Sequence, residues 1–485
     1  MLEKVLSYFE ELAKIPHGSG NTKAISDYCV NFAKDHSLEY YQDDSNNVII
    51  YKKASEGYES REPIMLQGHL DMVCEKEQGI DFDFRRDSLN LVIEDNYLTA
   101  KGTTLGGDDG IAVAMCLAIL DSDVKHPDLE VVFTTDEETG MFGAQALDCS
   151  HLKSRRLLNI DSEEEGVLTV GCAGGARAEL LLPLKPHYIP NNGNIDEDCF
   201  RVTVTGLIGG HSGAEIDKGR LNSNVVMGEF LLYLLDNDYH VRLIDIKGGN
   251  ADNVIPSETV ATIFATYEGD FMIAKDLQFL AQEFTLDTVV RTDPDLIVAV
   301  EPVDVPDDDN LTMMLGTVDS ERIIEILSSA PNGIMAMSTD IPNMVETSLN
   351  LGRVFVDSEY MHAGFLVRSS VEEEKQKLLN RLEALAATYG GKLVVDGVYP
   401  AWEYMRDSAF RDGVISVYRN LYKRDPQVLT IHAGLECGIL QGKMPGLDAI
   451  SIGPNILDIH SPSERLDLRS TERTINLVLK ILETL

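Results

Sequence analysis

Histidine and acidic side chains follow several apolar, strand-like runs of this chain, and these residue types can hold a divalent cation. Imidazole and carboxylate groups are the donors that suit Zn²⁺, Mn²⁺ or Co²⁺, and the absence of cysteine among them favours a catalytic over a structural metal site. Ligands of open α/β sheets bind outside the carboxyl ends of the strands. The candidates at or just after such ends are His69, Asp71, Glu137, Glu138, Asp161 and Glu163.

The stretch 101–110 places four glycines and the adjacent carboxylates of Asp108 and Asp109 directly before an apolar, helix-like run. Because glycine tolerates positive φ and leaves room, such a turn can bring carboxylate oxygens close to a cation. The ordinary alternative is a helix N-cap, with acidic residues at the positive end of the helix dipole. Taken alone, the stretch does not decide between the two interpretations.

The other candidates have ordinary interpretations as well. His69 could be a loop histidine with satisfied hydrogen bonds, and Glu137 with Glu138 could form a solvated acidic turn. His460, close to Pro462, could stabilise a turn. These would be independent coincidences, whereas one site explains all of them. A set this rich in acids predicts two divalent ions with a bridging carboxylate. Two such ions, roughly 3.5–4 Å apart, can polarise a carbonyl and lower the pKa of a bridging water.

Strand-like and helix-like runs alternate in the first part of the chain, which is the pattern of an α/β domain with a largely parallel sheet. From about residue 398 the same style returns. The expected strands include 48–51, 63–68, 129–135, 156–161 and 428–431, and the expected helices include 2–12, 109–121 and 470–485.

The middle of the chain has a different character. Three prolines from Pro183 to Pro190, followed by 191–194, predict a linker. Beyond it, alternating runs such as 200–205 and 259–266, with helices between and after them, predict an α+β domain with an antiparallel sheet. We therefore predict an α/β domain with a mixed, largely parallel sheet and an inserted α+β domain. The predicted segments are 1–184 and 398–485 for the first domain and 185–397 for the insertion.

The composition excludes several functions. A formal net charge of −39 over 485 residues argues against binding to nucleic acid and to anionic membranes. The seven cysteines show no zinc-site spacing, so buried reduced thiols in a cytoplasmic protein are expected. The N-terminus is an amphipathic helix rather than a signal peptide, and no apolar run is long enough to cross a bilayer.

Taken together, the motifs resemble the M20 family of co-catalytic zinc peptidases, and within it the aminoacyl-histidine (Xaa-His) dipeptidases. The resemblance covers nearly the whole chain, including 209–213 and 431–438, with no motif between 268 and 345. The segments that carry the candidate ligands are His69-Leu70-Asp71, Gly107-Asp108-Asp109-Gly110, Asp136-Glu137-Glu138-Thr139-Gly140, Asp161 and His460.

The resemblance implies a role for each of these residues. His69 and Asp161 would bind one ion, Glu138 and His460 the other, and Asp108 would bridge both. Asp71 would orient the ring of His69, and Glu137 would be the general base that takes a proton from the bridging water and passes it to the leaving amine. The resemblance also implies a cis peptide bond after Asp108.

The inserted domain resembles the lid of this family. His211 would stabilise the developing oxyanion, Asn253 would lie in a substrate-contacting loop, and Arg368 would grip the substrate's C-terminal carboxylate. A surface ion pair at a strand end is the alternative for Arg368. In many dimeric relatives the lid histidine reaches the neighbouring subunit's site, so a homodimer is one arrangement. The stretch 266–362 could instead form a second half of the lid within one chain.

The implied function is hydrolysis of Xaa-His dipeptides such as β-alanyl-histidine, and of other dipeptides. Zn²⁺ is the expected metal, with Mn²⁺ or Co²⁺ as alternatives, because nitrogen and oxygen ligands do not select one of them. A related hydrolase acting on acyl-amino acids or tripeptides is one alternative function. The other is a non-catalytic peptide-binding descendant, which the presence of Glu137 and of every expected ligand argues against.

Overall fold

The computed structural model describes residues 1–190, 199–267, 273–304 and 311–485. They form two compact units, one made of Met1–Cys172 with Pro400–Leu485 and the other of Ala173–Tyr399. The predicted linker residues 191–194 thus lie outside the described residues. Strand β9 (Gly174–Pro183) was assigned by the sequence to the first domain. It belongs to the second unit because it pairs with two strands there, and prolines mark only its end.

The first unit contains a mixed sheet with the strand order β1-β2-β6-β3-β7-β23-β8-β22. The pairs β6–β3, β3–β7, β7–β23 and β8–β22 are parallel, whereas β1–β2, β2–β6 and β23–β8 are antiparallel. The largely parallel sheet expected from the sequence is confirmed. Its strands are β1 (Glu39–Gln42), β2 (Val48–Lys52), β3 (Ile64–His69), β6 (Leu129–Thr134), β7 (Arg156–Asn159), β8 (Val167–Cys172), β22 (Gln427–Ile431) and β23 (Asp448–Ser451).

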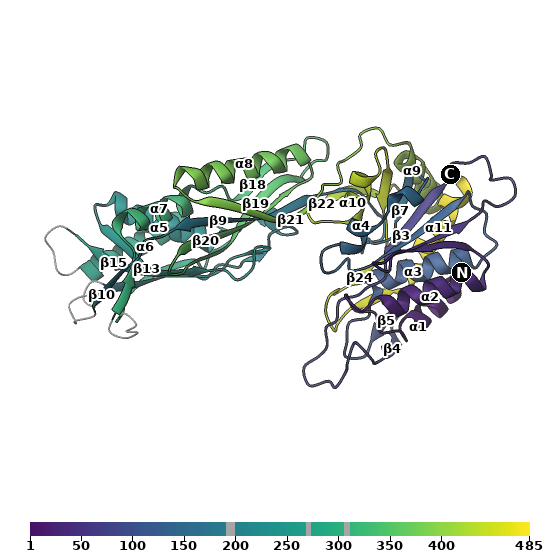
Figure 1. The fold of residues 1–485 in the computed structure, drawn as a ribbon, viewed down its shortest axis with the longest axis horizontal. Helices are drawn as coiled ribbons and strands as arrows, with labels where there is room; N and C mark the ends of the chain where they lie inside the picture. Colours follow the sequence, from purple (N-terminus) through teal and green to yellow (C-terminus); the bar gives the residue numbers. More distant parts are fainter. Residues whose placement is uncertain (191–198, 268–272, 305–310) are drawn as a thin grey trace. The chain divides into compact units, whose positions relative to one another are not determined.

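Helices cover both faces of this sheet, which explains why every residue of β3 and β6 is buried. Helices α10 and α3 lie on opposite faces of the sheet (Figure 1). Met65 of β3 packs in one core cluster with Leu440 of α10, and Gly68 of β3 lies against Ala112 of α3. The helices are α1 (Leu2–Leu12), α2 (Lys23–Asp35), α3 (Gly107–Leu120), α4 (Phe142–Ala146), α9 (Ala409–Tyr422), α10 (Glu436–Lys443) and α11 (Leu468–Thr484).

A small antiparallel sheet joins the two sequence segments that make up the first unit. Its strand order is β24-β25-β5-β4, so a C-terminal hairpin pairs with a hairpin that precedes α3. The strands are β4 (Leu91–Glu94), β5 (Tyr97–Ala100), β24 (Ile456–Leu457) and β25 (Arg465–Asp467).

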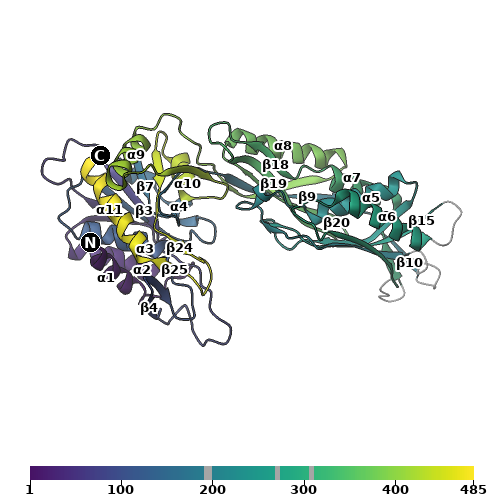
Figure 2. The same cartoon turned by 180° about the vertical axis from the view of Figure 1, so that it is seen from behind.

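The second unit is an antiparallel sheet in the order β16-β11-β15-β13-β19-β20-β9-β21, with β18 paired to β19. Residues alternate between buried and half-buried along β15, as expected for a sheet packed on one face, and the helices lie along that face (Figure 2). The elements are β11 (Cys199–Thr205), β13 (His240–Gly248), β15 (Thr259–Thr266), β16 (Ile297–Pro302), β18 (Gly333–Met337), β19 (Val345–Val356), β20 (Tyr360–Ser369), β21 (Lys392–Tyr399), α5 (Ser223–Asp236), α6 (Ile273–Thr288), α7 (Thr317–Ser329) and α8 (Glu372–Thr388).

Two short strand pairs complete the second unit. β12 (Gly210–His211) pairs with β14 (Val254–Ile255), and β10 (His187–Pro190) pairs with β17 (Leu311–Met314). The α+β class with an antiparallel sheet is thereby confirmed. Among the described residues, no helix is both long and apolar enough to span a membrane.

Candidate metal centre

His69 lies at the last position of β3, and its ring is almost completely buried at 1% exposure. Nδ1 donates a hydrogen bond to the backbone carbonyl of Asp71 at 2.9 Å, so the lone pair of Nε2 is presented on the other side of the ring. Nε2 lies 3.1 Å from Asp108 Oδ1 and 3.5 Å from Asp161 Oδ1. Burial lowers the pKa of His69, but the surrounding carboxylates, Asp161 foremost, outweigh it and raise the pKa well above its usual value.

The turn before α3 presents Asp108. Gly106 has a φ of +66°, which favours glycine, and the peptide bond between Asp108 and Asp109 is cis, as the family resemblance implied. Oδ1 of Asp108 faces His69, and Oδ2 lies 3.3 Å from Nε2 of His460. The two oxygens of one carboxylate therefore face two different imidazoles.

Asp109 does not cap the helix, contrary to the capping interpretation of this stretch. The N-cap of α3 is Gly106, without a side-chain cap, and Asp109 Oδ2 accepts the backbone N–H of His69 at 3.2 Å. This bond fastens the start of α3 to the end of β3. A side chain at Gly68 would overlap Asp109 and Ala112, so the glycine allows the close approach. Burial and the neighbouring Asp161 raise the pKa of Asp109 well above its usual value.

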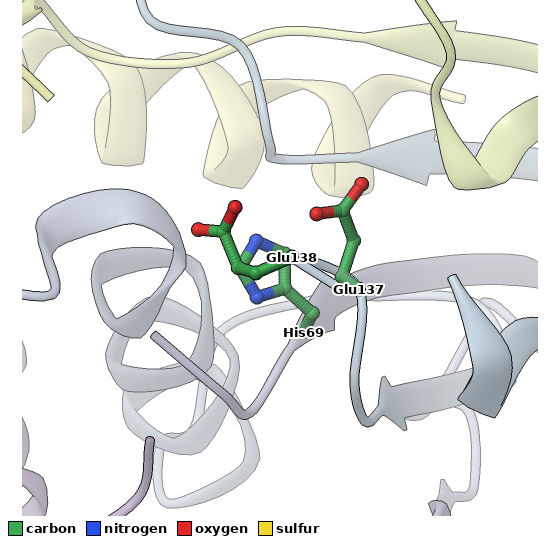
Figure 3. A group of neighbouring side chains, drawn as sticks. All are labelled: His69, Glu137 and Glu138. Atoms are coloured by element: carbon green, nitrogen blue, oxygen red, sulfur yellow. The ribbon is translucent and has the colours of Figure 1, made fainter. Parts of the chain in front are cut away.

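Glu137 and Glu138 occupy the turn that follows β6. In Figure 3 their side chains project from consecutive positions toward the same side, near the ring of His69. Glu138 Oε2 lies 3.1 Å from Nε2 of His460. Burial raises the pKa of Glu137 well above its usual value, and the charges of Asp161 and other nearby acids act in the same direction.

Asp71 supports the same turn. Its carboxylate accepts a hydrogen bond from the hydroxyl of Ser19 at 2.8 Å and the backbone N–H groups of Glu137 and Glu138 at 3.0 and 3.3 Å. The carboxylate is 3.6 Å from Nδ1 of His69, farther than the Asp71 carbonyl. The predicted orientation of the ring by Asp71 is therefore made mainly by its backbone, while its side chain holds the turn that carries Glu137 and Glu138.

Within the part of the chain that the structure describes, three groups of side chains bring their potential ligand atoms within 4.8 Å of one another. Asp108 is shared by two of the groups, and His69 also belongs to two. Glu163, a candidate from the sequence, belongs to none of the groups found among the described residues. The groups are His69 with Asp108 and Asp161, Asp108 with Glu138 and His460, and His69 with Glu137 and Glu138.

The charges in this cluster fit divalent cations. Burial, together with Asp108 and Glu138, raises the pKa of Asp161 to about 7, against the opposing charge of His69. Two imidazoles do not supply enough positive charge to balance the carboxylates crowded at this site. Since buried charges in proteins are normally paired or coordinate metals, the remaining negative charge favours bound cations. Oxygen and imidazole donors of this kind suit Zn²⁺, Mn²⁺ and Co²⁺. The residues present therefore fit two divalent ions.

A buried polar layer lies beneath the cluster, and the sequence pattern did not predict it. Gln67 Nε2 donates to Glu436 Oε2 at 2.6 Å, and Asn159 Nδ2 donates to Gln67 Oε1 at 2.6 Å. Gln67 precedes His69 by two positions and Asn159 precedes Asp161 by two, so the layer links the strands that end in these candidates. Polar residues within otherwise apolar strands were the available signal. Glu464, which contacts the turn of Asp108, gave no sequence signal.

The candidate residues of the second unit lie on β12, on the loop before β14 and on β20. Nδ1 of His211 accepts the backbone N–H groups of Gly213 and Ala214 at 3.1 and 2.9 Å, which places the proton of the neutral ring on Nε2. Burial, and then the charge of Arg368, lower the pKa of His211. Asn253 has an exposed side chain, and its carbonyl accepts the N–H of Ser212 at 2.9 Å.

Arg368 is 6% exposed, so it is not a surface residue. Its Nη1 donates to the hydroxyl of Tyr399 at 3.0 Å, and its buried Nε has no hydrogen-bond partner among the described residues. Arg368 of β20 and Tyr399 of β21 both face Gly175 of β9 in the strand register. A side chain at Gly175 would overlap the ring of Tyr399, so this glycine lets the tyrosine reach across β9 to the guanidinium.

An α/β sheet with a cluster of acids and histidines at its strand ends, interrupted by an antiparallel domain, is the architecture of a metallopeptidase. The sequence matches the model of peptidase family M20/M25/M40 over residues 65–484. The chain belongs to this family and is a hydrolase of peptide bonds.

Similar proteins agree with this assignment. The chain is 35% identical over 476 residues to the cytosol non-specific dipeptidase of Escherichia coli. The aligned region covers 98% of this chain and 96% of that protein. The crystal structure of aminoacylhistidine dipeptidase from Vibrio alginolyticus matches with a TM-score of 0.90 at 33% identity, over 99% of this chain and 96% of that one. Human carnosine dipeptidase 1, at 12% identity and a TM-score of 0.51 over 99% and 95% of the two chains, shares the fold.

Proposed function

We propose that this protein is a cytoplasmic, two-metal dipeptidase that hydrolyses Xaa-His dipeptides such as β-alanyl-histidine, together with other dipeptides. The observation that carries the proposal is the position of Asp108, whose two carboxylate oxygens face His69 on one side and His460 on the other. The names of the two relatives at 33–35% identity, an aminoacylhistidine dipeptidase and a cytosol non-specific dipeptidase, support the substrate class and the compartment.

The ligand sets follow from the groups of neighbouring donors. His69 and Asp161 would hold one ion, Glu138 and His460 the other, and Asp108 would contribute to both. When bound, two such ions polarise the substrate carbonyl and lower the pKa of a bound water. Zn²⁺ is the metal we expect, and Mn²⁺ and Co²⁺ suit the same donors.

Glu137 is the side chain we assign to proton transfer. It belongs to one donor group with His69 and Glu138, so its carboxylate is close to the ligands without being needed by either proposed ligand set. Glu137 would take a proton from the attacking water and deliver it to the nitrogen of the leaving amine, as a general base and then a general acid. Asp71 would act through Glu137 by holding the backbone of this turn.

Three residues of the second unit would bind the substrate. His211 would stabilise the oxyanion, because its backbone contacts leave a neutral ring with a donor N–H on Nε2. Arg368 would bind the C-terminal carboxylate, because its Nε donor is buried and lacks a partner among the described residues. Asn253 would contribute a side-chain amide from its exposed loop position. His211 would act on the metal centre of its own chain or on that of a partner chain, and a homodimer is compatible with both arrangements.

A substrate panel tests the proposal. The purified chain with added Zn²⁺ or Mn²⁺ should cleave β-alanyl-histidine and other dipeptides with a higher kcat/KM than tripeptides or N-acetyl amino acids. A higher kcat/KM for tripeptides or for N-acetyl amino acids would contradict the dipeptidase assignment. Cleavage of dipeptides without preference for C-terminal histidine would retain the dipeptidase and remove the Xaa-His specificity.

A further inference from the structure

Glu464 makes a set of contacts that the proposed reaction does not explain. Its carboxylate is 3% exposed and accepts hydrogen bonds from the backbone N–H groups of four consecutive residues. Oε2 accepts from Leu105 at 2.7 Å and Gly106 at 3.0 Å, whereas Oε1 accepts from Gly107 at 2.7 Å and Asp108 at 3.3 Å. The whole turn that presents Asp108 is therefore wrapped around one side chain.

This carboxylate comes from the other end of the sequence. Glu464 lies four positions after His460, its own N–H donates to the carbonyl of Ser461, and β25 begins at the next residue. β25 pairs with β5, which precedes the turn of Asp108. The segment of His460 and the segment of Asp108 are thus joined twice, once by the small sheet and once by Glu464.

The contact satisfies the backbone N–H groups of an irregular turn at the start of α3, where Asp108 and Asp109 have non-helical φ and ψ angles. The first N–H groups of a helix have no partner within the helix and are usually satisfied by a nearby side chain. Gly106, at the N-cap of α3, has no side chain, so the acceptor is supplied by Glu464. A Cβ atom at Gly107 would lie 3.1 Å from Glu464 Oε1, which leaves little room for any other residue there.

We propose that Glu464 is a positioning residue for the metal centre, which holds Asp108 and His460 at the separation that lets both face one ion. The inference rests on the proposed function, because it takes both residues as ligands. It predicts that changing Glu464 lowers the affinity for metal ions more than it lowers the rate of the chemical step. Neither residue is held in this way by its own loop alone, since the four N–H donors belong to one segment and the acceptor to the other.

Glu464→Gln is the informative change. A glutamine has one acceptor oxygen, and its amide NH₂ cannot accept a hydrogen bond, so two of the four N–H groups would lose their partner. Glu464→Asp keeps both oxygens on a side chain one methylene shorter and should have the smaller effect.

Glu130 provides a matched control in the same unit. It is also a buried glutamate, and its carboxylate accepts the backbone N–H groups of Lys153 at 2.9 and 3.0 Å and of Ser154 at 2.9 Å. It lies near the start of β6, whereas the metal-ligand candidates follow the end of that strand. Glu130→Gln should therefore lower stability in the same manner without changing the metal centre.

The experiment measures Zn²⁺ binding to the metal-free full chain by competition with a chromophoric chelator, along with bound-metal stoichiometry and thermal unfolding. Glu464→Gln should bind at least one of two ions at least tenfold more weakly than the parent, whereas Glu130→Gln should stay within twofold. In the metal-free protein, hydrogen exchange at residues 105–108 should be faster in Glu464→Gln than in the parent. A Glu464→Gln chain with parent-like affinity and exchange overturns the positioning role. If that variant does not fold, Glu464→Asp decides on the same two measurements.

The outcomes also separate this inference from the proposed function. A parent chain that binds two ions, with affinity lowered by Asp108→Asn but unchanged by Glu464→Gln, overturns only the role of Glu464. A parent chain that binds neither Zn²⁺ nor Mn²⁺ overturns the proposed metal centre, and the role of Glu464 with it.

Discussion

Each of the two units contains buried charged groups for which the chain supplies only some of the hydrogen-bond or charge partners. These groups are negatively charged in the first unit and positively charged in the second. In the first unit, the carboxylates of Asp108, Glu138 and Asp161 converge on two imidazoles. In the second unit, the buried Nε of Arg368 lacks a hydrogen-bond partner among the described residues. Because buried polar and charged groups are normally paired, we propose that the first region binds cations and the second an anion. The same physical deficit thus predicts two different kinds of ligand.

Among the tests of this comparison, removing divalent ions should have the largest effect on activity. Dialysis of the protein against a chelator should abolish dipeptide hydrolysis, and adding Zn²⁺, Mn²⁺ or Co²⁺ should restore it. The metal-free chain should also unfold at a lower temperature, because an ion present at 100 times its Kd stabilises the folded state by about 2.7 kcal/mol per site. Calorimetry, metal analysis and an activity assay check the prediction. Full turnover by a chain shown to contain no metal would contradict it.

Glu137→Gln should come next in size. Because general acid–base catalysis typically contributes about 10²–10⁴-fold, kcat should fall by about 10³-fold while metal stoichiometry stays unchanged. Asp136, which precedes Glu137 and accepts the backbone N–H of Gly20 at 2.6 Å, is the control within the same turn. Asp136→Asn should lose far less activity. A Glu137→Gln enzyme with near-parent kcat would show that the proton is transferred by another group.

Arg368→Ala tests the proposed anion-binding region of the second unit. Losing a hydrogen-bonded charge pair costs about 1.5–3 kcal/mol, so KM for free dipeptides should rise by about 10–100-fold. C-terminally amidated dipeptides should be affected much less, because they carry no carboxylate. Arg368→Lys should recover little, since an ammonium lacks the planar fork of the guanidinium. Equal losses on free and amidated substrates would remove the carboxylate-binding role.

Tyr399→Phe sharpens the same test. The variant removes the hydroxyl that accepts from Nη1 of Arg368 and leaves the ring beside Gly175. KM for free dipeptides should rise in the same direction as in Arg368→Ala but by a smaller factor. A larger rise than that of Arg368→Ala would mean that Tyr399 acts on the substrate by another route.

The smallest expected effect is the titration of His211. Its pKa should lie below 6.5, because burial and the charge of Arg368 disfavour the imidazolium. The unfolded chain then binds the proton more readily, so the stability contributed by the neutral ring falls as the pH drops below 6.5. NMR of labelled histidine in the full chain measures the value, and Arg368→Ala should raise it. A pKa at or above 6.5 would contradict the neutral donor assigned to His211.

Much of the architecture could be predicted from the sequence. The expected strand 63–68 is β3 (Ile64–His69), and the expected helix 109–121 is α3 (Gly107–Leu120), because apolar runs with clear boundaries reflect local preferences. The expected domain boundary at residue 184 differs from the division of the chain in the structure, which falls between Cys172 and Ala173. Prolines mark the end of β9, but the unit to which β9 belongs depends on its pairing with β20 and β21, which are more than 170 residues away.

The family, the class of each domain and the types of donor groups that follow the strands could all be predicted from the amino-acid sequence. These depend on residue identity, periodicity and order along the chain. Two contacts became apparent only in the folded chain: Asp109 accepts the backbone N–H of His69 instead of capping its helix, and Glu464 holds the turn of Asp108. Both contacts use backbone N–H groups, which every residue except proline carries, so no residue type reveals them. They arise only when distant segments are brought together by the sheet.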